Sequence, residues 1–203
     1  MLTAINVKTT RTYTMRARAE ATVETRGRIL DAVIALFEER LSLEVVLADV
    51  AERAGVSVQT VLRHYGSKED LFAAARARQH SLMVEERAVP VGDVPAAVST
   101  IVAFYERVGD WVLWLLAQEH VNEPSRAVVQ AGRRVHRDWV GEVCAPQLDG
   151  GRDRRELVDL LVIATDVYTW KLLRRDSGLD RATTGKRMLR LVRAVLPASS
   201  EGG

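Results

Sequence analysis

Two short helix-forming segments joined at a glycine constrain the fold of this chain more than any other feature of its 203 residues. Residues 49–65 have the sequence DVAERAGVSVQTVLRHY. Gly55 can adopt the left-handed backbone that ends a helix, and Ser57 is a suitable N-cap for the next one. The small Ala51 allows close approach of the two helices, and Val61 fills the angle between them. This pattern predicts a helix-turn-helix.

The remainder of the chain also favours helices. Prolines number five, and none lies before residue 90. Apolar residues recur at three- and four-residue spacing, as on one face of a helix. We therefore predict an all-α fold of about nine helices, which span residues 22–39, 48–54, 58–64, 68–87, 94–106, 109–118, 124–144, 153–175 and 180–196.

The distribution of charge and the ends of the predicted helices divide the chain into three parts. Residues 1–20 form a basic arm, expected to be mobile, because Lys8, Arg11, Arg16 and Arg18 occur before any acidic residue. Residues 21–68 form the helix-turn-helix domain, and residues 69–203 form a second helical domain. The sequence leaves open whether the arm lies along a DNA groove or is a solvated tail, and whether the native start is Met1 or Met15.

The composition excludes several classes of protein. A formal net charge of +2 neither excludes nor indicates a nucleic-acid partner, because a sum hides where the charges lie. The single cysteine, Cys144, excludes an internal disulfide framework and a zinc site built from several thiolates. The longest apolar run, residues 111–117, is too short to cross a membrane. The motifs of common hydrolases, zinc peptidases and nucleotide-binding enzymes are not found. We expect a cytoplasmic protein that is not an enzyme, with no cofactor, no metal and no membrane partner.

The second helix of the pair would present a polar surface suited to a DNA groove. If Val61 and Tyr65 point inward, the residues beside them point outward. Glutamine can bridge an adenine edge, arginine a guanine edge, and threonine can contact a phosphate or a thymine methyl group. Ser67 and Asp70 form a capping pair for the following helix, whose first residue would lie beside the DNA backbone. The predicted DNA-binding residues are Gln59, Thr60, Arg63, His64, Lys68 and Arg26.

With these residues in place, segment 25–72 resembles the DNA-binding domain of the TetR family of bacterial transcriptional regulators. The resemblance is carried by ILDAVIALFEER (29–40) and DVAERAGVSVQTVLRHYGSKEDLF (49–72). It implies a homodimer, a C-terminal ligand-binding and dimerisation domain, and repression of a palindromic operator relieved by a small molecule. Val46 and Leu62 replace residues that cap a helix or contact phosphate in many members, so these contacts are expected to be missing.

The second domain has no motif, and its aromatic residues support two interpretations. They either fill a core or line a pocket for an apolar or aromatic effector. Helices 153–175 and 180–196 either pair with their copies in a dimer or form an internal hairpin. A DNA-binding regulator or activator controlled by a protein partner, without a small ligand, is the alternative function. The candidate ligand-binding residues are Phe104, Trp111, Trp114, His120, His136, Trp139 and Tyr168.

Overall fold

A computed structural model describes residues 5–148 and 153–196, without the side chains of residues 5–15 and 18. Within these ranges the chain is helical and has no strand, which confirms the predicted all-α class. It divides into two compact units, residues 1–80 and 81–203. The division lies inside one helix, twelve residues after the boundary that the sequence suggested. No helix in the described ranges is long and apolar enough to span a membrane.

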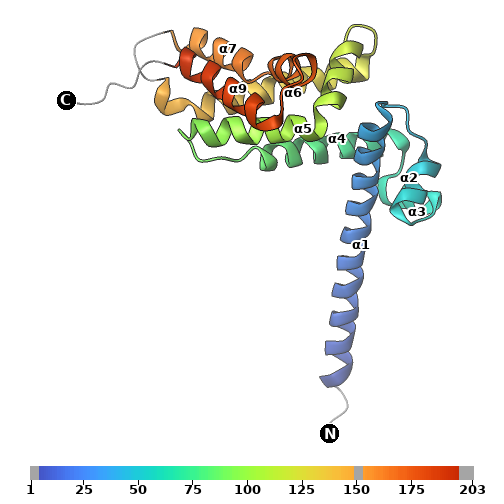
Figure 1. Cartoon of the computed structure of the whole chain (residues 1–203). Coiled ribbons are helices and arrows are strands. Elements are labelled where there is room, and N and C mark those ends of the chain that lie inside the picture. The colour runs from blue at the N-terminus through green and yellow to red at the C-terminus, as the bar shows by residue number, and fades with distance from the viewer. Residues whose placement is uncertain (1–4, 149–152, 197–203) are drawn as a thin grey trace. The chain divides into compact units, whose positions relative to one another are not determined.

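The first unit is built on α1 (Ile5–Arg40), with α2 (Leu47–Ala54), α3 (Val58–Tyr65) and the start of α4 (Lys68–Glu86). Figure 1 shows α2 and α3 beside the C-terminal part of α1. Both guanidinium Nη atoms of Arg53 on α2 lie 2.6 Å from the carboxylate oxygens of Glu39 on α1. The predicted apolar stripe of α1 is buried, together with residues from the other helices: Ile29, Val33, Leu36, Phe37, Val50, Val61 and Leu71.

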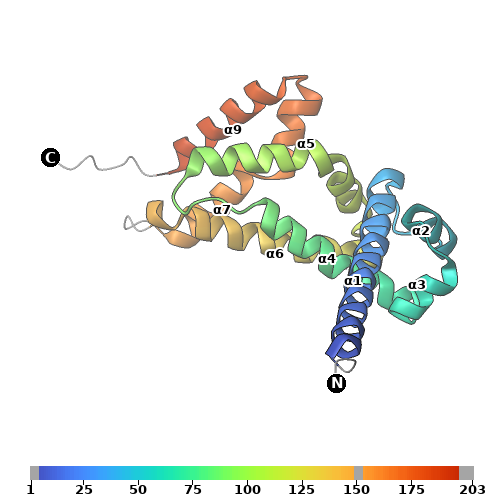
Figure 2. The same ribbon diagram turned by 90° about the horizontal axis from the view of Figure 1, so that it is seen from below.

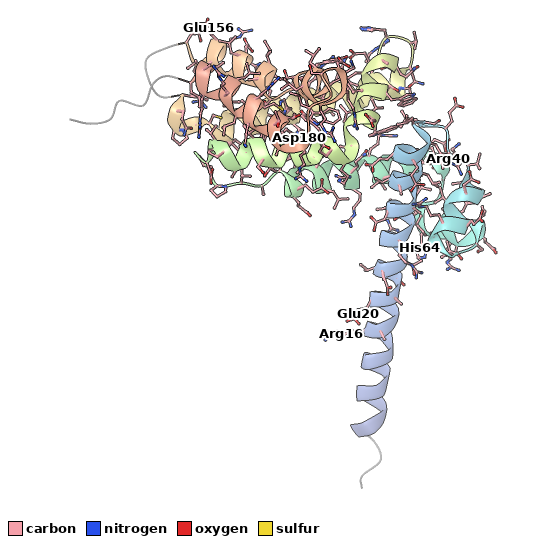
Figure 3. The ribbon with its side chains drawn as sticks, viewed as in Figure 1. Arg16, Glu20, Arg40, His64, Glu156 and Asp180 are labelled. Atoms are coloured by element: carbon pink, nitrogen blue, oxygen red, sulfur yellow. The ribbon has the colours of Figure 1, made fainter. Side chains whose placement is uncertain are left out.

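The start of α1 differs from the prediction. The helix begins at Ile5 and not near residue 22, so most of the predicted mobile arm is helical. Residues 5–26 contain neither glycine nor proline, so nothing in this segment interrupts a helix. Arg16 Nε lies 2.9 Å from Glu20 Oε1 one turn later, an exposed pair that Figure 3 labels. The side chains of Lys8, Arg11 and Arg18 lie outside the described residues.

The second unit packs its helices around one apolar core. Figure 2 shows α5 (Val94–Gln118) running beside α6 (Glu123–Val143) and α9 (Arg181–Val195). Between α6 and α9 come the 3₁₀ turn η1 (Ala145–Gln147), α7 (Arg154–Ala164), α8 (Val167–Lys171) and the π-helical turn η2 (Leu172–Asp176). Trp170, Ile101, Leu161 and Met188 are fully buried in this core.

Two predicted helix boundaries in this unit are wrong, for identifiable reasons. The predicted helices 94–106 and 109–118 form one helix, α5. Gly109 does not end a helix but lies inside α5, where its lack of a side chain leaves room for the Trp170 ring. A Cβ atom at Gly109 would come within 2.5 Å of Trp170 Cζ3. The predicted helix 153–175 is interrupted, because Thr165 Oγ1 donates to the Leu161 carbonyl and Asp166 caps α8.

Candidate nucleic-acid interface

The turn between α2 and α3 has the predicted geometry. Gly55 has a φ of 66° and ψ of 38°, and its N–H bonds to carbonyls at the end of α2. Ser57 then caps α3, since its Oγ accepts a hydrogen bond of 3.1 Å from the N–H of Thr60. The helix-turn-helix prediction is confirmed, and both of its signals were local ones, a left-handed glycine and an N-cap serine.

The outward surface of α3 is formed by two pairs of residues one turn apart. Val61 and Tyr65 are buried, as predicted. Gln59 and Arg63 are exposed, which leaves their side chains free to meet base edges. Val58 and Leu62 are also exposed, by 37% and 38%, and were not among the predicted contacts. The helix therefore presents a mixed polar and apolar surface.

Thr60 and His64 are less available than predicted. Thr60 is partly buried, and its hydroxyl lies 3.0 Å from Ser57 Oγ, so it takes part in the cap of its own helix. His64 is also partly buried. Desolvation and the nearby charges of Arg63 and Arg26 lower its pKa. In the chain without DNA, this lowering favours the neutral imidazole, which can donate one hydrogen bond to a phosphate.

Arg26 connects α1 with the end of α3. Its guanidinium lies 4.5 Å from the centroid of the Tyr65 ring and donates to the backbone carbonyl of His64. In return, the Tyr65 hydroxyl donates to the carbonyl of Arg26 at 2.8 Å. The carbonyl of His64 belongs to the last turn of α3, where helix carbonyls lack partners within the helix. Arg26 thus holds the recognition helix in place, a structural task that sequence analysis did not identify. It remains exposed beside the interface.

The start of α4 carries the next predicted contact, Lys68. Ser67 Oγ accepts from the N–H of Asp70 at 3.0 Å and lies 2.7 Å from the Asp70 carboxylate, which confirms the predicted capping pair. The Lys68 side chain is partly buried, and its ammonium lies 5.2 Å from the Phe72 ring centroid. At the N-cap of α2, Val46 makes no side-chain hydrogen bond, as expected from its apolar side chain.

The predicted ligand-binding residues fall into three groups. Phe104, His136 and Trp139 lie around one residue that the sequence did not single out, Arg87, whose carbonyl accepts from Trp139 Nε1 at 2.7 Å. Trp111 and Trp114 stack on each other, with ring centroids 5.1 Å apart.

The third group, His120 and Tyr168, is exposed and outside both clusters. Tyr168 faces away because its neighbours Val167 and Trp170 occupy the buried side of α8. His120 lies in the turn after α5, where its ring is 3.7 Å from the Glu119 carboxylate. These two residues remain predictions without structural support for a shared pocket.

Two hollows lie among the described side chains of the second unit. A small apolar cavity of about 10 Å³ lies beside Trp139 and Thr165 and has room for about one water molecule. A larger, open hollow of about 770 Å³ follows α6 and the start of α7, but charged residues line it and none of the predicted ligand residues does. Among the described residues, no group of three or more His, Cys, Asp or Glu side chains is placed to hold a metal ion.

Comparisons with known proteins agree with this geometry. Residues 29–75 match the family described as "Bacterial regulatory proteins, tetR family". A crystal structure from a Rhodococcus species, described as a TetR-family transcriptional regulator, superposes with a TM-score of 0.58 and 18% sequence identity. The match covers 86% of this chain and 100% of the other, and at that identity it shows the fold alone. No curated protein sequence matches the chain.

Proposed function

We propose that this chain is a homodimeric repressor of the TetR family, a family of DNA-binding transcription factors and not of enzymes, and the match of residues 29–75 to that family supports the proposal. In this proposal it binds a palindromic operator and leaves it when a small apolar or aromatic ligand binds. The cytoplasm is the proposed location, because operator DNA lies there in bacteria.

The exposed face of α3 is the observation that carries the proposal. Gln59 and Arg63 lie one turn apart and are exposed, and no hydrogen bond or ion pair among the described residues holds their side chains away from a base pair. Their side chains match adenine and guanine edges in the major groove. The caps at Ser57 and Ser67 and the Arg26–Tyr65 contact hold the backbone around them. A reading surface on a rigid support favours sequence-specific binding over a purely electrostatic contact.

Exposed apolar residues on the late helices support the homodimer. The helices that the sequence suggested for dimerisation carry large apolar side chains that the single chain leaves in solvent. Such residues favour a partner surface, and an isologous dimer supplies the same surface twice. A dimer would also present two reading helices to successive major grooves. The residues concerned are Leu160, Ile163, Tyr168, Leu172 and Leu191.

A ligand can release the dimer from DNA only if it has a higher affinity for the conformation that does not bind DNA than for the conformation that does. The cluster of Phe104, His136 and Trp139 supports a ligand response, because aromatic rings and a polar group converge there. The small size of the neighbouring cavity means that a ligand would have to displace side chains. Displacement of these side chains would change the packing of the second unit.

Selection of bound sequences from random double-stranded DNA tests the proposal. We expect an enriched motif made of two inverted half-sites, each containing adenine and guanine positions. Enrichment of a single half-site would contradict the homodimer but not the DNA-binding role. Failure to enrich any motif, with a chain shown to be folded by circular dichroism, would contradict the DNA-binding role itself.

A further inference from the structure

The second unit buries a positive charge that has no carboxylate partner among the described residues. Arg87 directly follows α4 and is 4% exposed. Its Nε and Nη1 atoms are inaccessible to solvent and have no hydrogen-bond partner. Among the described residues no carboxylate pairs with it, and its neighbour Glu86 binds Arg107 instead. A buried charge without an oppositely charged partner is strongly unfavourable in proteins, so its presence requires an explanation.

One aromatic ring packs against this guanidinium, and a second aromatic residue bonds to the backbone of Arg87. The Cζ atom lies 4.1 Å from the centroid of Phe104 on α5, a distance typical of a cation–π contact. The indole N–H of Trp139 on α6 donates to the Arg87 backbone carbonyl. Such rings accommodate a planar, apolar body, but they supply no formal negative charge. The guanidinium therefore retains two free donors inside an aromatic environment.

A second unpaired polar atom lies in the same cluster. His136 is 6% exposed and stacks on Trp139, with ring centroids 5.8 Å apart. Its Nε2 atom is 3.1 Å from Thr165 Oγ1, which already donates to the Leu161 carbonyl. Nε2 is therefore the protonated nitrogen, and Nδ1 is a buried acceptor without a partner. The cluster thus combines unpaired donors with an unpaired acceptor, which a purely structural core seldom retains.

We propose that this cluster binds the carboxylate of a small aromatic acid, with Arg87 as the pairing group and Phe104 and Trp139 as walls for the ring. A carboxylate accepts two parallel hydrogen bonds from a guanidinium, through Nη1 and Nη2 or through Nε and Nη2, so either arrangement would give one of the unpaired nitrogens a charged partner. The proposal narrows the effector of the proposed function from an apolar or aromatic molecule to an aromatic anion. It rests on that function for its regulatory meaning, whereas the binding itself can be measured without DNA.

The position of Arg87 in the chain gives the binding event a route to the reading surface. Arg87 is the first residue after α4, and α4 begins with Lys68 beside the Ser67 cap. A carboxylate bound by Arg87 would act on the C-terminal end of this one helix. A shift of Arg87 would also act on α6, because Trp139 on α6 donates a hydrogen bond to the Arg87 carbonyl.

Thermal unfolding followed by tryptophan fluorescence tests the proposal. The four tryptophans, at positions 111, 114, 139 and 170, lie in the second unit, so the signal reports its unfolding. The full chain is heated with acetate, benzoate or 1-naphthoate, each compared with its uncharged amide. We expect at least one aromatic acid to raise the Tm by about 3 °C or more in a saturable manner, while its amide does not.

Two variants assign the effect to Arg87. Arg87→Met keeps the length of the side chain and removes the charge, so the rise in Tm with the carboxylate should be lost. Arg107→Met is the matched control, because Arg107 lies 5.6 Å from the same Phe104 ring but is paired with Glu86 and more exposed. It should keep the rise. Should Arg87→Met fail to fold, Arg87→Lys keeps the charge without the planar fork and should bind the same acid at least about tenfold more weakly.

The proposal is overturned if no carboxylate differs from its amide in the unmodified chain. It is also overturned if Arg87→Met responds to the acid as the unmodified chain does, or, where that variant does not fold, if Arg87→Lys binds it with unchanged affinity. Addition of the same acid to the DNA complex separates this result from the proposed function. Binding of the acid without release of DNA would leave the site in place and contradict the ligand-controlled repressor.

Discussion

In the first unit, the polar side chains around the helix-turn-helix are paired, whereas the second unit buries several that are not. Ser57, Ser67 and Tyr65 each bond to a backbone group, and Arg26 bonds to the end of α3. The inaccessible side-chain atoms without a partner in the described structure all belong to the second unit: Arg87 Nε and Nη1, Ser125 Oγ, His136 Nδ1, Gln147 Oε1 and Thr184 Oγ1.

The difference indicates how the two units divide their tasks. A reading helix needs its backbone at a fixed position before DNA arrives, and the satisfied hydrogen bonds at Ser57, Tyr65 and Ser67 fix that backbone. An interior that responds to a ligand must instead form favourable new interactions when the ligand binds. Unpaired polar groups can form such interactions, because the ligand supplies the hydrogen-bond partners that they lack. Four experiments test this comparison, ordered from the largest expected effect to the smallest.

Acid should destabilise the second unit through His136. Burial and the nearby Arg87 lower the pKa of His136 to about 3, so the folded state keeps this residue neutral. Between pH 6.5 and 3 the unfolded state binds more protons, and stability falls as the pH is lowered through this range. The full contribution is present above pH 6.5. The slope is about 1.4 kcal/mol per pH unit, or about 3 kcal/mol at pH 4.

Tryptophan fluorescence during urea unfolding at several pH values measures this slope. His136→Gln should flatten it, since the amide does not titrate. His120→Gln is the matched control, because His120 is exposed, and it should keep the slope of the unmodified chain. An equal slope in the two variants would show that another group is responsible.

Gly109→Ala should destabilise the second unit by about 2 kcal/mol, because the new methyl group would overlap the buried Trp170 ring. The control is Gly132→Ala on α6, where a Cβ atom meets nothing within 4 Å. There the change should stabilise the unit by up to about 1 kcal/mol, the usual gain from alanine in a helix. Urea unfolding measures both free energies of unfolding. If both variants changed the free energy of unfolding in the same direction, the close packing of Trp170 on Gly109 would be contradicted.

Arg63→Ala should weaken binding to the selected operator by about 10- to 100-fold, the usual value of a bidentate contact to guanine. The loss should be largest for operators that retain the guanine and small for those in which it is replaced. Arg193→Ala on α9 removes the same charge from the second unit and should change affinity much less. Fluorescence anisotropy with labelled operator gives both values. Equal losses would indicate that Arg63 acts through charge alone.

Leu62 and Val58 should contribute the smallest effect, through contact with thymine methyl groups. Both are exposed on the same side of α3 as Gln59 and Arg63, and an apolar side chain suits the C5 methyl of thymine. Replacement of operator thymines by uracil, one at a time, should reduce affinity by about threefold at the contacted position, from the loss of one buried methyl group.

The Leu62→Ala variant gives the control for this experiment. In that variant the uracil substitution should have no further effect, because the side chain that contacts the methyl group is gone. A persistent threefold loss in Leu62→Ala would assign the contact to Val58 or to the shape of the DNA. Tight binding with no uracil effect in the unmodified chain would leave α3 as a purely polar reader.

The success of prediction from sequence depended on how far apart the interacting residues lie. The helix-turn-helix could be predicted because its signals act over three or four residues, as in the pairs Ser57–Thr60 and Ser67–Asp70. The role of Arg26 could not, because its partner Tyr65 is 39 residues away. The same holds for Gly109, whose role depends on Trp170 from a later helix.

The sequence by itself therefore determined the helical class, the turn at Gly55 and the outward direction of Gln59 and Arg63, since helix periodicity and capping are local. Only the tertiary structure decided which polar groups pair with residues distant in the chain and which are buried without a partner. Arg87 follows two acidic residues at the end of a polar helix, where sequence favours solvent exposure. Packing of α5 and α6 buries it against Phe104 and beside Trp139, because burial is set by neighbours that are distant along the chain.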